Sequence, residues 1–92
     1  MAKESILQNK ILKWLRSNGY YAEKIILASR RGTADIISCV RGYYVAIEVK
    51  APGKQLTELQ DYRRRCIQEA GGIYIVAHSL DDVERAIRVL YG

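Results

Sequence analysis

The sequence is poor in the residues on which several classes of small protein depend. It has two cysteines, one histidine, one proline and no phenylalanine among 92 residues. Cys39 and Cys66 are too few for a disulfide framework, and no Cys-x-x-Cys pair marks a zinc site. We expect both thiols to be free and buried, because apolar residues flank each of them. With His78 as its one histidine, the chain also lacks the ligands of a metal site built on several histidines.

Long apolar runs are also missing. The longest uncharged apolar stretch has about five residues, far fewer than the ~20 that a membrane-spanning helix needs. The first residues, Met1–Ser5, contain no apolar signal region. We therefore expect no membrane partner and a location in the cytoplasm.

Basic residues exceed acidic residues. Fifteen lysines and arginines against ten aspartates and glutamates give a net charge of +5. A basic surface attracts and steers polyanions, so nucleic acid is an expected partner; the alternative is that the charge serves solubility alone. A chain of this length buries only about 60–65% of the surface that its unfolded form exposes, which suffices for one core. We expect a single domain over residues 1–92.

The spacing of apolar residues, with capping residues and glycines, predicts an α/β fold whose elements follow the order αβββαβα. The predicted helices are residues 5–18, residues 57–70 and a last helix that begins after residue 79. The predicted strands are residues 20–28, 34–40, 43–50 and 73–76. The middle strands are apolar on both faces, so helices should cover a mixed four-stranded sheet on both sides.

Two adjacent predicted strands bring a pair of carboxylates together. If Arg41-Gly42 forms the centre of a two-residue hairpin turn, Asp35 and Glu48 become direct cross-strand neighbours, with Cβ atoms roughly 5 Å apart. Because side chains alternate along a strand, Lys50 shares the face of Glu48.

Opposed carboxylates repel each other unless positive charge lies between them. A divalent cation meets this need, and magnesium suits a site with two carboxylates, a carbonyl, waters and a substrate phosphate. Lys50 would then orient or deprotonate an attacking water. The alternative is a simple cross-strand ion pair of Lys50 with Asp35 or Glu48. The apolar character of both strands favours the metal, because buried acids need a partner.

Three residues of the predicted helices point toward the same place. Glu4 falls on the apolar stripe of the first helix and faces inward if that helix extends back to residue 4, or else it complements the helix dipole as a first-turn acid. Gln60 lies on or beside the stripe of the second helix, and it is also the third residue of a capping box with Thr57. Arg63 lies there too, unless its charged end simply extends past the edge of the core.

Together these residues resemble the PD-(D/E)xK nuclease superfamily. The more specific resemblance is to the VRR-NUC family, the virus-type replication-repair nucleases, in their short stand-alone form. Four features carry it: a first helix with Glu4, and the segments Arg31–Ile37, Ile47–Lys50 and Leu56–Gln60. The proline that the superfamily has before its first acid is absent, and Ala34 stands in its place.

The resemblance implies a metal-dependent DNA endonuclease that uses Mg²⁺ or Mn²⁺. Asp35 and Glu48 are the implied metal ligands, together with the main-chain carbonyl of Val49. Lys50 is implied to position the water and to stabilise charge at the phosphate.

The same resemblance extends to two helix residues and to the substrate. Gln60 resembles the family's helix glutamine beside the site, and Glu4 resembles the acid on the first helix of related junction resolvases. Short members resemble Holliday-junction resolvases that act as dimers on four-way DNA, so a homodimer acting on branched DNA is expected. A viral origin, with action in the host cytoplasm, is implied in the same way. The expected DNA contacts are Arg30, Arg31, Lys54 and Arg63.

Two other functions remain open. A basic DNA-binding module with this fold would bind without cutting, and an accessory subunit would need a larger partner. Intact Asp35, Glu48 and Lys50 favour cutting, since a degraded site usually loses one of them. Five of the seven tyrosines lie near strand ends or a helix start and fit either a dimer interface or the edge of a small core. They are Tyr20, Tyr21, Tyr43, Tyr44 and Tyr62.

Overall fold

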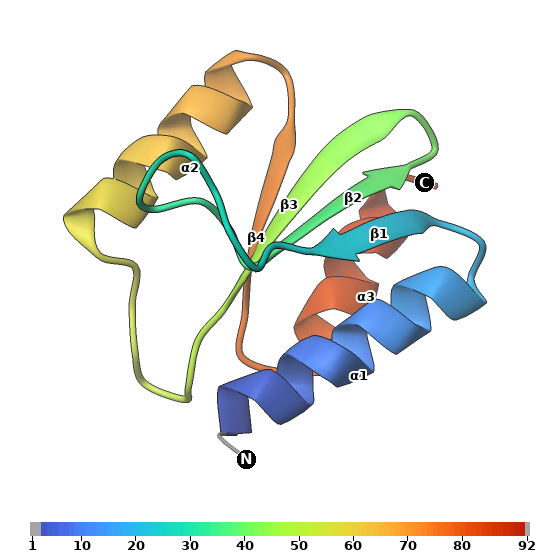
Figure 1. The fold of residues 1–92 in the computed structure, drawn as a ribbon. Coiled ribbons are helices and arrows are strands. Elements are labelled where there is room, and N and C mark those ends of the chain that lie inside the picture. Colours follow the sequence, from blue (N-terminus) through green and yellow to red (C-terminus); the bar gives the residue numbers. More distant parts are fainter. Residues whose placement is uncertain (1–2, 92) are drawn as a thin grey trace.

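A computed structural model describes residues 3–91 (Figure 1). Its elements follow the predicted order αβββαβα. The helices are α1 (Lys3–Ser17), α2 (Glu58–Glu69) and α3 (Leu80–Val89), and the strands are β1 (Tyr21–Lys24), β2 (Ile36–Val40), β3 (Tyr43–Val49) and β4 (Ile73–Ala77). None of the helices in the described range is both long and apolar enough to cross a membrane.

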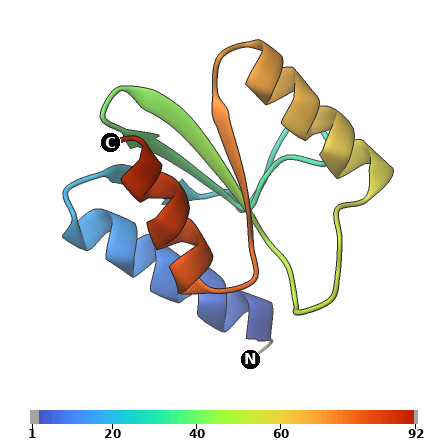
Figure 2. The same cartoon turned by 180° about the vertical axis from the view of Figure 1, so that it is seen from behind.

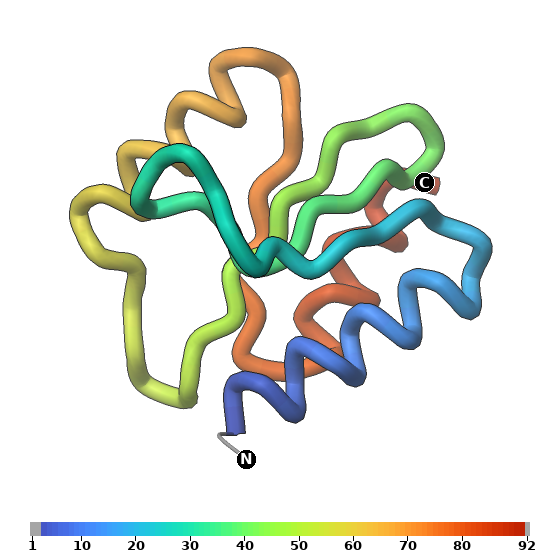
Figure 3. The backbone as a smooth tube through the Cα atoms, viewed as in Figure 1, coloured from blue at the N-terminus to red at the C-terminus, as the bar shows by residue number. Residues whose placement is uncertain are grey.

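The strands form one mixed sheet in the order β1-β2-β3-β4. β1, β2 and β3 are antiparallel neighbours, whereas β4 pairs with β3 in parallel. A parallel pair needs a crossover, and the chain makes it through the long loop and α2 that separate β3 from β4 (Figure 3). The predicted fold class is confirmed.

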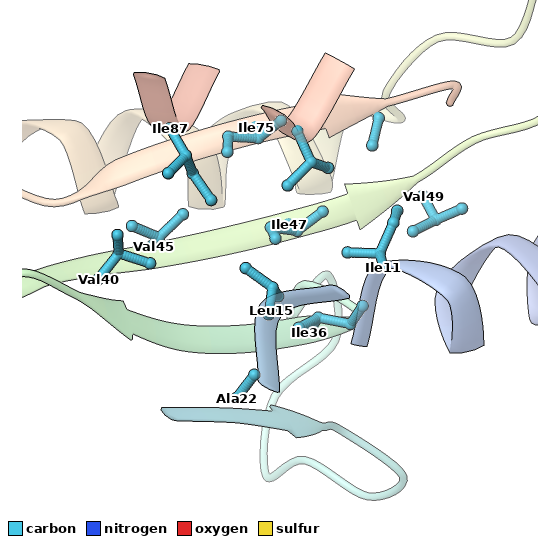
Figure 4. Packing of buried hydrophobic residues seen from close by; sticks show 12 residues of the cluster. Ile11, Leu15, Ala22, Ile36, Val40, Val45, Ile47, Val49, Ile75 and Ile87 are labelled. Carbon is cyan, nitrogen blue, oxygen red and sulfur yellow. The ribbon is translucent and has the colours of Figure 1, made fainter. Parts of the chain in front are cut away.

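Helices cover both faces of the sheet, as the apolar strands predicted. α1 and α3 pack together on one face, and α2 lies on the other (Figures 1 and 2). The larger core lies under α1 and α3, and Figure 4 shows its side chains in close view. It contains Ile11, Leu15, Ala22, Ile36, Val40, Val45, Ile47, Val49, Ile75, Ala77, Val83 and Ile87.

The alternation along β3 decides what each face carries. Val45, Ile47 and Val49 belong to the core under α1 and α3. Ala46 belongs to a smaller cluster under α2, and Glu48 lies two residues further along the same face. The face of the sheet beneath α2 therefore carries Glu48, the one charged residue of β3.

The predicted strand 20–28 is wrong after residue 24. The last β1–β2 pair is Lys24 with Ile36, and beyond it the chain has no strand to pair with. Ile26 and Leu27 are 91% and 92% exposed instead of paired. Strand propensity is satisfied only where a neighbouring strand supplies hydrogen bonds, and the loop of residues 25–35 leaves the sheet here.

The expectation of buried thiols is also wrong, because both cysteines are exposed. Cys39 lies on the α2 side of β2 opposite Tyr44, in a part of the sheet that α2 does not reach. Cys66 lies on an open side of α2. The prediction failed because it relied on apolar neighbours in the sequence. On a strand or a helix, adjacent residues project in different directions, so a buried neighbour does not imply a buried cysteine.

Gly32 fixes the loop of residues 25–35 against α2. It has φ +81°, and a Cβ there would come within 2.9 Å of Leu59 Cγ and 3.2 Å of the Leu59 carbonyl oxygen. Gly19 has the same φ of +81°, with nothing within 4 Å of such a Cβ. The two glycines thus share a backbone conformation and differ in the space around it.

Gly32→Ala should therefore lower the free energy of unfolding more than Gly19→Ala does. The left-handed conformation alone costs about 1–3 kcal/mol for a residue with a Cβ, and the contact with Leu59 should add ~1 kcal/mol or more at position 32. Urea unfolding of both variants measures the difference. If the two variants lose equal free energy of unfolding, the loop of residues 25–35 can move away from α2 without loss of stability.

Candidate metal centre

Asp35 and Glu48 lie opposite each other, as the hairpin register predicted. The observed pairs run from Val40 with Tyr43 to Ile36 with Ile47, and Asp35 and Glu48 follow as the next opposed positions. Arg41 and Gly42 have φ 52° and 85°. A type I′ hairpin turn needs positive φ at both central residues, and this turn sets the register that brings the acids together.

Glu48 is a buried acid whose two oxygens have different surroundings. The residue is 4% exposed. Its Oε2 accepts a hydrogen bond of 3.2 Å from Gln60 Nε2 and lies 4.0 Å from Lys50 Nζ. Its Oε1 is buried, and in the ionised state no donor among residues 3–91 hydrogen-bonds to it. A buried carboxylate oxygen of this kind requires a partner, since leaving it unsatisfied is costly.

Asp35 is half-buried and is held by the backbone of β3. Its Oδ2 accepts a hydrogen bond of 2.8 Å from the Val49 N–H, and its carbonyl accepts one of 2.8 Å from Ile25 N–H. Burial, followed by the negative charge of Asp35 and by a hydrogen bond to Asp35 that the protonated carboxyl group makes, raises the pKa of Glu48 to about 8, and Lys50 opposes this shift. The charge of Asp35 is therefore close enough to disfavour ionisation of Glu48 in the absence of a cation.

Gln60 fulfils both of its alternative roles. Its backbone N–H donates to Thr57 Oγ1, and its Oε1 accepts from the Thr57 N–H, which completes the capping box of α2. Its remaining Nε2 donates to Glu48. The start of α2 is therefore tied directly to the acidic pair.

Glu4 also reaches the edge of the site while it sits in the first turn of α1. Its Oε2 accepts a hydrogen bond of 3.2 Å from the Ala51 N–H. With Lys50, Ala51 and His78 it lines a small cavity of about 210 Å³. Its negative charge is near enough to contribute to the raised pKa of Glu48.

The four predicted DNA contacts lie in different places. Arg30 and Arg31 are exposed and line a hollow of about 290 Å³ that also borders Asp35. Arg63 uses its Nε–H to bond the Arg31 carbonyl at 3.1 Å, which holds this loop on α2. Lys54 lines a separate hollow of about 430 Å³ on the other side of the α2 start.

The sequence did not predict two residues that lie near the site, Tyr74 near Glu48 and His78 near Lys50. The Tyr74 hydroxyl is buried without a hydrogen-bond partner among the described residues, and burial together with Glu48 and Asp35 raises its pKa well above the usual range. His78 Nδ1 lies 3.2 Å from the carbonyl oxygens of both Lys50 and Ala51. The position of Tyr74 near the acidic pair follows only from the parallel β3–β4 register, which pairs Tyr74 with Ala46.

These donors fit a hard divalent cation. Residues 3–91 contain no group of three or more histidine, cysteine or acidic side chains placed so that they could hold a metal ion, so a cage made wholly of such side chains is absent from that range. Mg²⁺ commonly uses one or two carboxylates and keeps several waters or substrate oxygens. Asp35 and the unpartnered oxygen of Glu48 provide that donor set, and the Val49 carbonyl belongs to the same strand end.

Comparison with solved structures identifies the fold. A structure named "VRR_NUC domain" superposes with a TM-score of 0.83 at 21% identity, covering 96% of this chain and 97% of that one. The chain has the VRR_NUC fold. A "VRR_NUC domain protein" matches this fold with a TM-score of 0.76 at 19% identity, over 96% of this chain and 87% of the other. No family model and no curated protein matches the sequence.

The raised pKa of Glu48 predicts an inverted pH dependence for the metal-free protein. Between pH 4.5 and about 8 the unfolded chain loses the Glu48 proton while the folded protein keeps it. The free energy of unfolding should therefore fall as pH rises through this window, by at most about 1.4 kcal/mol per pH unit. Urea unfolding in chelator at several pH values measures the slope.

Glu48→Gln should flatten this slope and stabilise the metal-free protein at pH 8, because the amide carries no charge. Glu69→Gln, at an exposed position of α2, is the matched control and should leave the slope unchanged. A Glu48→Gln profile that parallels the unsubstituted protein would show that folding does not raise the pKa of Glu48.

Proposed function

We propose that the chain is a metal-dependent DNA endonuclease that hydrolyses phosphodiester bonds. The observation that carries the proposal is the buried Asp35–Glu48 pair, with one unpartnered carboxylate oxygen beside Lys50. The VRR_NUC fold and the arginine-lined hollow next to Asp35 support it.

Each residue has a distinct task in this reaction. Mg²⁺ or Mn²⁺, held by Asp35, Glu48 and the Val49 carbonyl, would supply Lewis-acid stabilisation of charge on the phosphate. Lys50 lies at the mouth of the pair, with its side chain 14% exposed; there it orients the attacking water and balances charge that develops on the phosphate oxygens. Gln60 and the Val49 N–H keep the two carboxylates in place.

Loss of either acid or of the lysine should abolish most cleavage. Asp35→Asn, Glu48→Gln and Lys50→Ala should each lower the cleavage rate by about 10²-fold or more, because each removes a charge that acts on the reacting phosphate. The measurement is cleavage of four-way, flap, splayed and linear DNA with Mg²⁺ or Mn²⁺.

Two controls make the cleavage result decisive. Glu69→Gln and Lys13→Ala change the same residue types far from the pair and should cleave normally. DNA binding, measured in chelator, should survive in the three site variants. Cleavage by Glu48→Gln at the rate of the unsubstituted protein would refute the assignment, and binding without cleavage by any metal would leave a non-cleaving DNA-binding module.

The arginines beside Asp35 should provide affinity without base recognition. Each phosphate contact contributes about −0.9 to the slope of log K against log salt on duplex DNA. Arg30→Ala with Arg31→Ala should therefore flatten that slope by nearly two and weaken every DNA form alike. The control is Arg85→Ala with Arg88→Ala, on α3 across the sheet, which should change the salt slope little. Equal slopes in the two double variants would place Arg30 and Arg31 outside the interface.

A finer part of the proposal is a homodimer acting on branched DNA. Two coordinated cuts in a four-way junction need two sites, and two-fold symmetry provides them. Light scattering of the free protein at micromolar concentration should give twice the 10.5 kDa mass of one chain. The monomer mass, together with full junction cleavage where only monomer exists, would contradict it.

A further inference from the structure

The face of the sheet that carries the acidic pair is only half covered. α2 packs against β4, at one edge of the sheet, and the same face of β1 and β2 extends beyond it (Figure 1). The exposure of Cys39 on β2 is a direct result. An open sheet face next to a reactive centre is a surface on which a substrate can lie flat.

Two exposed tyrosines lie in one row across this open face. Tyr21 on β1 pairs with Cys39 on β2, and Cys39 pairs with Tyr44 on β3. Paired residues of neighbouring strands project from the same face, so all three share the face of Glu48. Tyr21 is 67% exposed and Tyr44 is 45% exposed.

The row lies at a defined separation from the acidic pair. Tyr44 precedes Glu48 by four residues on the same strand, which is roughly 13 Å along the strand. Successive nucleotides of an extended single strand are separated by less than this distance. A strand whose phosphate lies at the acidic pair therefore places a base one or two nucleotides away over the tyrosines.

A cavity beside Tyr44 adds apolar walls and positive charge. Its volume is about 390 Å³, and its lining includes Leu27, Ile37, Tyr44 and Cys66 together with Arg30 and Arg63. A flat apolar floor with arginines around it matches the two parts of a nucleotide, the base and its phosphate.

We propose that this stacking surface, composed of Tyr21, Tyr44 and the cavity beside Tyr44, binds unpaired bases of the DNA next to the cleaved phosphate. The inference rests on the proposed function for its substrate, DNA, and adds that the bound segment is single-stranded. In duplex DNA the faces of the bases are already stacked, so only unpaired bases can use aromatic side chains in this way.

Charge argues against a second copy of the chain as the occupant. In a two-fold interface the same patch meets itself, so the arginine-bearing surface of one copy would meet the arginine-bearing surface of the other. Juxtaposed like charges oppose such an interface, whereas the phosphates of a DNA strand complement them.

Adjacent tyrosines of β3 provide a matched test. Tyr43 is 46% exposed, nearly the same as Tyr44, but it projects from the opposite face. The probe is flap DNA with 2-aminopurine in its unpaired arm, and binding is measured in chelator so that no cleavage occurs. Tyr44→Ala should weaken flap binding about tenfold and remove the change in 2-aminopurine fluorescence that accompanies binding. Tyr43→Ala should change neither the affinity nor the fluorescence response. Tyr44→Trp should have both the affinity and the fluorescence response of the unsubstituted protein.

Cysteine labelling gives a second, independent readout. In a Cys39→Ser background, maleimide labelling of Cys66 reports on the cavity alone. Flap DNA should slow this labelling several-fold more than fully paired duplex of equal length does. Equal protection by the two DNAs would overturn the proposal.

The outcomes separate this inference from the proposed function. A chain that binds flaps through Tyr44 but never cuts would overturn only the endonuclease assignment. Cleavage by the unsubstituted protein, with Tyr44→Ala and Tyr43→Ala equal in flap binding, would overturn only the stacking surface. A fall from dimer to monomer mass in Tyr44→Ala, with unchanged flap binding, would assign the surface to a second copy and also overturn it.

Discussion

The arrangement of this site follows from the burial of Glu48 opposite Asp35. Two acids at opposed positions of a sheet, one of them 4% exposed, are unfavourable for the metal-free fold. The surrounding groups each reduce that cost: the Gln60 amide, the Val49 N–H and the Lys50 ammonium are directed at the pair. One oxygen of Glu48 remains without such a group, and this residual cost is what a bound cation would remove.

The fold can tolerate this cost because stability and chemistry lie on opposite faces of one sheet. Every second residue of β3 enters the large core under α1 and α3, and that core contains no acid. The residues between them face α2, where the apolar cluster is small. Burial of apolar surface stabilises the first face, which leaves the second free to keep charged groups close together.

The sequence predicted what depends on local rules and missed what depends on distant contacts. Arg41-Gly42 sets a turn, the turn sets the register, and the register places Asp35 beside Glu48 without any further information. Strand 20–28 was predicted too long because the end of β1 depends on where its antiparallel partner β2 begins. Tyr74 was missed because its place beside the acids depends on a parallel pairing across a crossover.

Gln60 shows why alternative roles in a sequence need not exclude each other. A side-chain amide has an acceptor end and a donor end. The acceptor end is used by the Thr57 N–H in the helix cap, so the donor end alone faces Glu48. Capping thereby fixes the orientation of the amide and makes Gln60 a group that favours the ionised carboxylate. A glutamate at this position would cap α2 equally well, but it would direct a third negative charge at the acidic pair.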